Sequence, residues 1–343
     1  MNPPFPRWLP IVALCVVATL GYLGIHWLLQ PKVDPSTEPP VRAVNIATGA
    51  NFQDVVTELD EKGIIKNRSG FILLAKLTSA DRRIRPGEYA FHAGMPPLDI
   101  LSLLEEGKVA LHHVTIPEGF TVRQIAARLE AKGLVDGQEL LRLTRDPAFI
   151  HSLKLDVASL EGYLFPTTYR FVKDSKPEDI LRTMVAFTWK AFTPELRERA
   201  GTMGMSLHEI LTLASVIEKE TGAPSERALI SAVFHNRLRR NIPLQSDPTV
   251  IYALEAFDGN LRKRDLSVKS PYNTYRVRGL PPGPIANPGA AAIRAALHPA
   301  KARYLYFVSR NNGTHHFSST LAEHNRAVNK YQKYRRRVSR RVS

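Results

Sequence analysis

Residues Leu211–Tyr252 read LTLASVIEKETGAPSERALISAVFHNRLRRNIPLQSDPTVIY. The apolar run that opens this segment ends at Ile217 and leads, without a turn signal, into Glu218 and Glu220. Burial disfavours the charged form of a carboxyl group and raises its pKa. A carboxyl group with a raised pKa can hold a proton near neutral pH and give it to a leaving group. The segment therefore predicts an acid catalyst near the end of an apolar helix.

We expect the helix that carries these glutamates to begin after a cap at Ser206 and to end near Gly222. Because each helical residue adds about 100°, Glu218 and Glu220 lie about 200° apart around the axis, and only one can face a given cleft. Periodicity does not choose between them, since both stack on apolar residues of the preceding turns. The alternative is that both are surface acids near a helix end, with Lys219 as their partner.

The residues that follow predict two more helices and a set of polar loops. Ser225 is expected to cap a second helix that packs on the first, and Asp247 to cap a third, over Thr249–Leu254, with Pro248 as its first residue. The loops SPYNTY (270–275) and GLPPGPI (279–285) then supply amide, hydroxyl and aromatic groups. Neutral donors and acceptors interleaved with tyrosines suit a polyol better than a phosphate.

Composition sets limits on the class of protein. The 343 residues suffice for two or three domains. The chain has 47 Lys and Arg against 32 Asp and Glu, a formal charge of +15, which favours anionic partners such as nucleic acid, anionic lipid or acidic cell-wall polymers. Its one cysteine, Cys15, lies in an apolar segment, which excludes a disulfide framework and a cysteine metal site. No metal or organic cofactor is implied.

The N-terminal segment Trp8–Leu29 contains no Lys, Arg, Asp or Glu and has the length of a membrane-spanning helix. Trp8 and Trp27 stand at its two ends, where interfacial aromatic residues are common. No small-x-small cleavage site follows it, so we expect an uncleaved anchor rather than a signal peptide. The expected orientation has the N-terminus inside and the bulk of the chain outside.

Two segments, Ile46–Ile65 and Ile116–Val135, resemble each other. Each predicts a short strand, a turn at a glycine and an amphipathic helix ended by a second glycine. A third relative, Phe91–Gly107, follows a strand-like GEYAF. Small units of this shape resemble LysM modules, which bind sugar polymers, but a repeat of this kind is as commonly scaffold. After an aromatic stretch over Leu160–Phe171, a helical stretch is expected over Pro177–Met203.

Several motifs of the chain occur in an order that resembles one family. They are LASVIEKET, the run Asn236-Arg237-Leu238, LQSDPTVIY, SPYNTY, GLPPGPIANPG, and HHFSST followed by Glu323-His324. Together they resemble the membrane-anchored endolytic murein transglycosylases, the MltG or YceG-like family. The resemblance covers the anchor, the repeat-bearing region and the C-terminal half. One departure is Thr167 in FPTTY, where an Asp is expected.

The resemblance implies that Glu218 is the catalytic acid. Members of the family cut the β-1,4 bond between N-acetylmuramic acid and N-acetylglucosamine without water. One carboxyl group protonates the glycosidic oxygen and then takes the proton of the muramyl C6 hydroxyl, which closes on C1 as a 1,6-anhydro ring, whereas most glycoside hydrolases need two carboxyl groups. The resemblance assigns substrate positioning to Gln245, Ser246, Asp247, Thr249, Tyr252, Tyr272, Asn273 and Tyr275. It assigns supporting positions to Glu220, Asn236 and Arg237.

The expected fold class is α+β, with an N-terminal transmembrane helix, LysM-like small α/β subdomains and a mainly helical lytic-transglycosylase catalytic domain. The expected parts are a cytoplasmic N-terminus (1–7), the anchor (8–29), a linker (30–42), the LysM-like region (43–170), the catalytic domain (171–329) and a basic tail (330–343). The tail is either a solvated end or a contact with anionic lipid or wall polymer.

The expected function is endolytic cleavage of nascent peptidoglycan strands, which terminates their elongation, at the periplasmic face of the bacterial inner membrane. The expected partners are glycan strands, membrane lipid and cell-wall synthases, without nucleic acid. One alternative is a non-catalytic peptidoglycan-binding membrane protein. A second, suggested by the positive charge, is a nucleic-acid-binding membrane protein whose binding falls steeply with salt.

Overall fold

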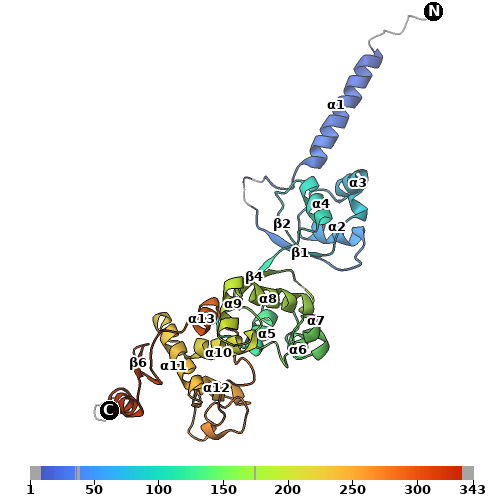
Figure 1. The fold of residues 1–343 in the computed structure, drawn as a ribbon. Coiled ribbons are helices and arrows are strands. Elements are labelled where there is room, and N and C mark those ends of the chain that lie inside the picture. The colour runs from blue at the N-terminus through green and yellow to red at the C-terminus, as the bar shows by residue number, and fades with distance from the viewer. Residues whose placement is uncertain (1–8, 35, 37–38, 174, 334–343) are drawn as a thin grey trace, which may run out of the picture. The chain divides into compact units, whose positions relative to one another are not determined.

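The computed structural model describes residues 9–34, 36, 39–173 and 175–333 (Figure 1). These residues form a mainly helical fold with three two-stranded sheets, which confirms the expected α+β class at that level. The chain divides into two compact units. Unit 1 contains Met1–His112 and Arg170–Lys173, and unit 2 contains His113–Tyr169 and Asp174–Ser343. The boundaries expected from the sequence stay a prediction.

Unit 1 begins with helix α1 (Leu9–Leu29). Among the residues that the structure describes, no helix has both the length and the apolarity that crossing a membrane requires. The expected cytoplasmic segment 1–7, together with Trp8, lies outside the described residues.

The rest of unit 1 is built on an antiparallel pair of strands, β1 (Arg42–Ile46) and β2 (Gly87–Phe91). Arg42 lies opposite Phe91, and Ile46 lies opposite Gly87. Helices α2 (Phe52–Glu61) and α3 (Arg68–Thr78) and the 3₁₀ turn η2 (Ala80–Arg82) connect the strands, and α4 (Pro97–Glu106) follows β2. Their apolar side chains form one core, which includes Val44, Val56, Leu59, Tyr89, Ile100 and Leu104.

The strand, turn and helix expected in each repeat are confirmed. In the first repeat, Gly49 and Gly63 have φ of +86° and +63°, on either side of α2. In the second, β3 (His112–Thr115) leads through Gly119, with φ of +74°, into α5 (Val122–Glu130), and Gly133 follows with φ of +64°. Glycine adopts these left-handed conformations without a steric penalty, so it marks the turns and helix ends.

Strand β3 pairs with β4 (Thr168–Phe171), and the chain between these strands forms α5, α6 (Gly137–Leu143) and α7 (Pro147–Ser152). The helical stretch expected over Pro177–Met203 consists of two helices, α8 (Pro177–Ala191) and α9 (Pro194–Thr202). It divides because Pro194 cannot donate a backbone hydrogen bond inside a helix but suits the first residue of a new one.

Helix α10 (Leu207–Glu220) lies at the centre of unit 2. All residues of Ile210–Ile217 are buried, and the helix packs against α9, α11 (Arg227–Arg239), α12 (Asp247–Ala253) and α13 (Ala290–Leu297). Its start is confirmed: the Ser206 hydroxyl accepts the Glu209 N–H at 3.2 Å, and the Glu209 carboxylate accepts the Ser206 N–H at 2.8 Å. A helix held on so many sides gives its last turn, with Glu218, a fixed position.

Two expected helix caps are each wrong by one residue. The 3₁₀ turn η3 (Pro224–Glu226) precedes α11, so that Glu226 and not Ser225 stands before the helix. Helix α12 begins at Asp247 itself, after Ser246, and the Asp247 side chain does not cap it. That carboxylate instead accepts the Tyr275 hydroxyl at 2.6 Å.

The C-terminal part of unit 2 contains η4 (Asp265–Ser267), an antiparallel pair of strands and a last helix. The strands are β5 (Tyr306–Ser309) and β6 (His315–Ser318), and they are followed by α14 (Leu321–Val328) and the π-helical turn η5 (Asn329–Lys333). Most of the expected basic tail, 334–343, lies outside the described residues.

Candidate active site

Glu218 lies in the last turn of α10 with a side chain that is only 9% exposed. Its Oε2 accepts the backbone N–H of Gly289, just before α13, at 3.0 Å. Its Oε1 lies 3.4 Å from Nη2 of Arg227, the first residue of α11. The expected apolar surroundings therefore hold for the helix up to Ile217, whereas the carboxylate itself lies between a backbone amide and a guanidinium group.

A second carboxylate, Glu118, lies at the same place and was not predicted. A Cβ atom on Gly289 would overlap the Glu118 carboxylate, so Glu118 rests directly against the residue whose N–H binds Glu218. Burial and then the charge of Glu218 raise the pKa of Glu118, and the charge of Arg227 opposes this rise. Its one sequence signal is its position in IPEGF, beside the turn glycine of the second repeat.

Arg227 and Lys219 complete the surroundings of the two acids. Lys219 Nζ donates to the carbonyl of Gly119 at 3.3 Å, which ties the turn after Glu118 to α10. Arg227 is 15% exposed, and its Nε is buried without a hydrogen bond to any described residue. A buried donor without a partner carries a desolvation cost, so this N–H is suited to an incoming oxygen atom.

Glu220 points to a different partner, as its expected separation from Glu218 around the helix requires. Its Oε1 accepts the Ser246 hydroxyl at 2.6 Å. Burial raises the pKa of Glu220 to about 7; the Ser246 hydrogen bond opposes the rise, and the charge of Asp247 adds to it. The Asp247 carboxylate accepts the hydroxyl of Tyr275.

Two other residues of the predicted site, Thr249 and Asn273, are buried, with polar atoms that bond within the protein. The Thr249 hydroxyl donates to the Ser246 carbonyl at 2.6 Å. The Asn273 amide donates to the carbonyls of Leu266 and Val268 at 3.0 and 2.9 Å. These bonds hold α12 and the loop 265–275 in place.

Arg237, Asn236 and Gln245 form a third group. Arg237 is buried and donates to the Leu305 carbonyl at 2.7 Å and to Oε1 of Gln245 at 3.1 Å. The Asn236 amide donates to the carbonyls of Ala302 and Tyr304. Gln245 is exposed with φ of +52°. Arg237 and Asn236 thus hold the segment before β5 against α11, whereas Gln245 is exposed to solvent.

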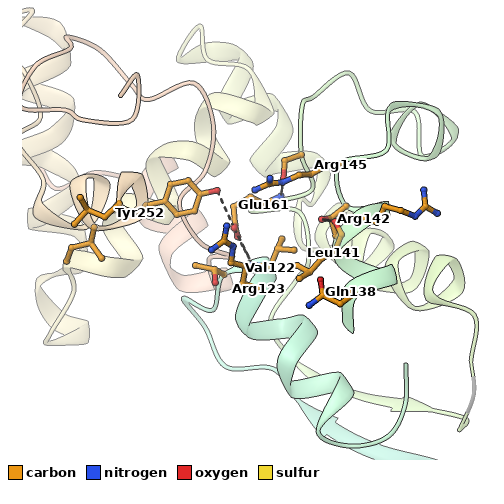
Figure 2. A pocket seen from close by; sticks show the side chains of 13 residues that line it. Val122, Arg123, Gln138, Leu141, Arg142, Arg145, Glu161 and Tyr252 are labelled. Carbon is orange, nitrogen blue, oxygen red and sulfur yellow. Dashed lines mark hydrogen bonds between the residues drawn. The ribbon is translucent and has the colours of Figure 1, made fainter. Parts of the chain in front are cut away.

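A pocket of about 570 Å³ opens beside another buried acid, Glu161 (Figure 2). Glu161 accepts the Val122 N–H at 3.1 Å, the Asn287 amide at 3.1 Å and the Tyr252 hydroxyl at 3.4 Å. Burial raises the pKa of Glu161 to about 7 against these hydrogen bonds. The Tyr252 ring lies on the Tyr272 ring, with centroids 5.0 Å apart. Glu161 was not predicted; its signal is a lone acid in the aromatic stretch LEGYLFP.

The segment 287–289 connects the two places. The Asn287 side chain reaches Glu161 in the pocket, and two residues later the Gly289 N–H binds Glu218. The predicted residues Glu218 and Tyr252 are thus linked through a short stretch of GPIANPG. Among the described residues, no group of His, Cys, Asp and Glu could hold a metal ion.

The sequence profile of the YceG-like family matches residues 44–330. The chain belongs to this family. This match includes Glu218 and Glu118, Glu220 and Asp247, and the pocket beside Glu161. A protein of Bacillus subtilis (strain 168) named endolytic murein transglycosylase is 35% identical over 320 residues, which cover 89% of this chain and 88% of that protein.

Two further proteins that are similar to this chain agree with this assignment. A protein of Streptococcus pneumoniae (strain D39) with the same name is 30% identical over 352 residues, covering 93% of this chain and 63% of that protein. The crystal structure of a YceG-like protein from Listeria monocytogenes is similar with a TM-score of 0.60 and 37% identity, covering 83% of this chain and 98% of the other.

Proposed function

We propose that this YceG-like protein is a lytic transglycosylase that cleaves within peptidoglycan strands, with Glu218 as both acid and base. The names of the bacillar and streptococcal relatives support the reaction class. The observation that carries the proposal is Glu218 itself, a nearly buried carboxylate at the fixed end of α10 with Gly289 N–H on one oxygen and Arg227 near the other.

The reaction needs an acid at one step and a base at the next. Protonated Glu218 gives its proton to the glycosidic oxygen, the bond from this oxygen to the muramyl C1 breaks, and the leaving N-acetylglucosamine keeps the proton. The carboxylate then takes the proton of the muramyl C6 hydroxyl, whose oxygen bonds to C1. Glu218 ends protonated again, no water is consumed, and one carboxyl group suffices where most glycoside hydrolases use two.

The neighbours of Glu218 suit both states. Arg227 and the Gly289 N–H stabilise the carboxylate left after the first step, because preorganised donors favour charge as it develops. Glu118, with its raised pKa, serves as a second proton store beside Glu218. Burial and the charge of Glu218 both raise the pKa of Glu118, so Glu118 keeps its proton to higher pH than an isolated glutamate does.

Substrate positioning falls to the polar and aromatic groups around α12. Tyr252, Tyr272 and Gln245 are at least partly exposed, and tyrosine rings offer an apolar face to a sugar and a hydroxyl to its oxygens. In this proposal Asp247 and Tyr275 act as a hydrogen-bonded pair at the same surface. Ser246, Thr249, Asn273, Glu220, Asn236 and Arg237 hold the loops that present these groups.

Unit 1 is proposed to be a LysM-like module that binds glycan. Its β1-α2-α3-β2 order, with the two strands antiparallel, supports this. Sedimentation of the full chain with purified sacculi, compared with a chain lacking residues 42–107, tests the role. Equal sedimentation of both proteins would mean that unit 1 does not bind glycan and serves as scaffold.

The proposal extends to the setting of the reaction. The uncharged apolar sequence of residues 8–29 supports an anchor in the bacterial inner membrane, with the N-terminus inside, the rest in the periplasm, and cell-wall synthases nearby. Membrane fractionation, followed by protease treatment of spheroplasts, tests this. Recovery of the full chain in the soluble fraction would contradict the anchor.

The test of the reaction compares the full chain with Glu218→Gln on purified sacculi, with new glycan ends identified by mass spectrometry. Glu255→Gln, an exposed acid in the same unit, is the matched control. We expect 1,6-anhydromuramyl ends from the wild type and the control, and a rate about 100- to 10,000-fold lower from Glu218→Gln. New reducing ends would mean hydrolysis, and binding without cleavage would select the non-catalytic alternative.

A further inference from the structure

The pocket beside Glu161 has more positive charge than the protein itself neutralises. It lies entirely in unit 2 and is walled by α5, α6 and α12. Three arginines line it, Arg123, Arg142 and Arg145. The lining also includes the neutral polar residues Thr121, Gln138, Thr144 and Ser159. Its volume of about 570 Å³ is within the usual range for small-ligand sites.

Among the residues that the structure describes, Arg142 is the only one of these three arginines with an ion-pair partner. Arg142 lies 2.7 Å from Glu139 and 3.4 Å from Asp146, and Figure 2 shows its side chain extending away from Glu161. Arg123 and Arg145 form no ion pair with any residue that the structure describes. Two guanidinium groups at the pocket are therefore free to bind an anion.

Glu161, the acid in the pocket, forms no ion pair with Arg123 or Arg145. Both oxygens of Glu161 are already used by the Val122 N–H, the Asn287 amide and the Tyr252 hydroxyl. Arg145 lines the pocket near enough for its charge to act on both Glu161 and Tyr252. The pocket thus combines free guanidinium forks with a tyrosine ring beside them.

We infer that this pocket binds a carboxylate group carried by peptidoglycan, next to the bond that Glu218 cleaves. Planar guanidinium groups bind carboxylates through two parallel hydrogen bonds, and the tyrosine face suits the sugar that carries the group. In peptidoglycan this carboxylate is either the lactyl group of a muramic acid without a peptide or a carboxylate of the stem peptide. The inference rests on the proposed function.

The position of the pocket supports this ligand. Asn287 contacts Glu161 in the pocket and Gly289 contacts Glu218, and two residue steps span at most about 7 Å. The pocket and Glu218 are therefore joined through one short segment, and in this proposal a substituent on a sugar next to the cleaved bond enters the pocket. A carboxylate held there would fix the register of the strand over Glu218, and this would make the pocket a specificity site.

The test uses full-length Arg123→Ala, Arg145→Ala and the double variant. Arg128→Ala, an exposed arginine on α5 outside the pocket, is the matched control, and Arg145→Lys keeps the charge but loses the fork. Three strand preparations are compared: with stem peptides, without peptides, and without peptides but with the lactyl carboxylates converted to amides. Formation of 1,6-anhydro ends gives KM and kcat for each.

We expect the double variant to raise KM about 10- to 100-fold, with kcat changed less than about threefold, since hydrogen bonds to charged groups are lost in the ground and transition states alike. Arg128→Ala should match the wild type. An effect on peptide-free strands that disappears on the amidated ones identifies the lactyl group. An effect confined to peptide-bearing strands identifies the stem.

An unchanged KM of the double variant on all three preparations would overturn the inference. Failure of the proposed function is distinguished by a second measurement, which is calorimetric binding of the same strands to Glu218→Gln with and without the arginine substitutions. This binding measurement does not require turnover of the strands. Loss of affinity on removing the arginines supports the pocket even if the wild type releases no anhydro ends, and equal affinity contradicts it.

Discussion

Glu218 and Glu118 meet at Gly289, whose N–H binds the first carboxylate and whose missing side chain leaves room for the second. Arg227 lies near both, since its charge also acts on Glu118. At this scale catalysis depends on a few atoms, namely two carboxyl groups near one cation, and a backbone amide that is bonded to Glu218. Each of the three side chains, Glu218, Glu118 and Arg227, can be removed by a single substitution.

Glu118→Gln tests whether the second acid takes part. Without Glu118 the proton store beside Glu218 is lost, so we expect kcat for anhydro-end formation at neutral pH to fall about 10- to 100-fold, with little change in KM. The matching variant is Gly289→Ala, whose methyl group would displace the Glu118 carboxylate while φ of −78° accommodates alanine. Wild-type kcat in both variants would assign Glu118 a structural role only.

At the scale of elements, the site depends on how the stretch 160–166 docks against the segment 284–287. The Leu164 N–H donates to the Asn287 side chain at 2.8 Å, and the Asn287 N–H donates to the Phe120 carbonyl at 2.8 Å. Gly162 makes this possible, because a Cβ atom there would overlap the Pro284 ring. The buried helix α10 and this docked segment together fix Glu218 relative to Gly289.

Gly162→Ala should therefore be strongly destabilising. Its φ of +84° costs an alanine about 1–2 kcal/mol, and the overlap with Pro284 costs about 1–3 kcal/mol more, so the free energy of unfolding should fall by about 2–5 kcal/mol. Denaturant unfolding measures this. Gly204→Ala is the control, with φ of +66° and no atom near its Cβ, and should lose only the first part. Equal losses in the two variants would rule out the docking argument.

How far the sequence predicted these elements depends on where each signal lies in the chain. Local signals sufficed for α10, whose capping box at Ser206 and apolar run are contiguous, and for the glycine-bounded repeats. They failed for the start of α12, because a partner 28 residues away, Tyr275, engages Asp247. They failed also for Glu118 and Glu161, since contacts with residues far along the chain bring these acids to Gly289 and Tyr252.

At the scale of the whole molecule, two acids with raised pKa values make stability depend on pH. The folded-state pKa values of Glu161 and Glu220 are each about 7, against 4.5 for an ordinary glutamate. Between these values the folded protein binds protons that the unfolded chain does not. The free energy of unfolding therefore decreases as pH rises from about 4.5 to 7, by up to about 1.4 kcal/mol per pH unit for each group. Above that range it levels off.

Denaturant unfolding at pH 5, 6, 7 and 8 measures this dependence. Glu161→Gln and Glu220→Gln should each give a shallower decrease between about pH 5 and 7, whatever their effect on stability at one pH. The exposed Glu255→Gln should leave the slope unchanged. Equal slopes in all four proteins would show that these acids ionise in the folded state as they do in the unfolded chain. A wild-type stability that rises between pH 5 and 7 would contradict the predicted direction.

The central claim is that Glu218 closes a ring on the muramyl sugar instead of activating water. Digestion of sacculi in water enriched in heavy oxygen tests it most directly, because hydrolysis places one solvent oxygen on C1 of the muramyl sugar and ring closure places none. We expect muramyl ends that are lighter than a reducing end by the mass of one water, without the heavy isotope, and absent with Glu218→Gln. Reducing ends that carry the heavy oxygen would contradict the account.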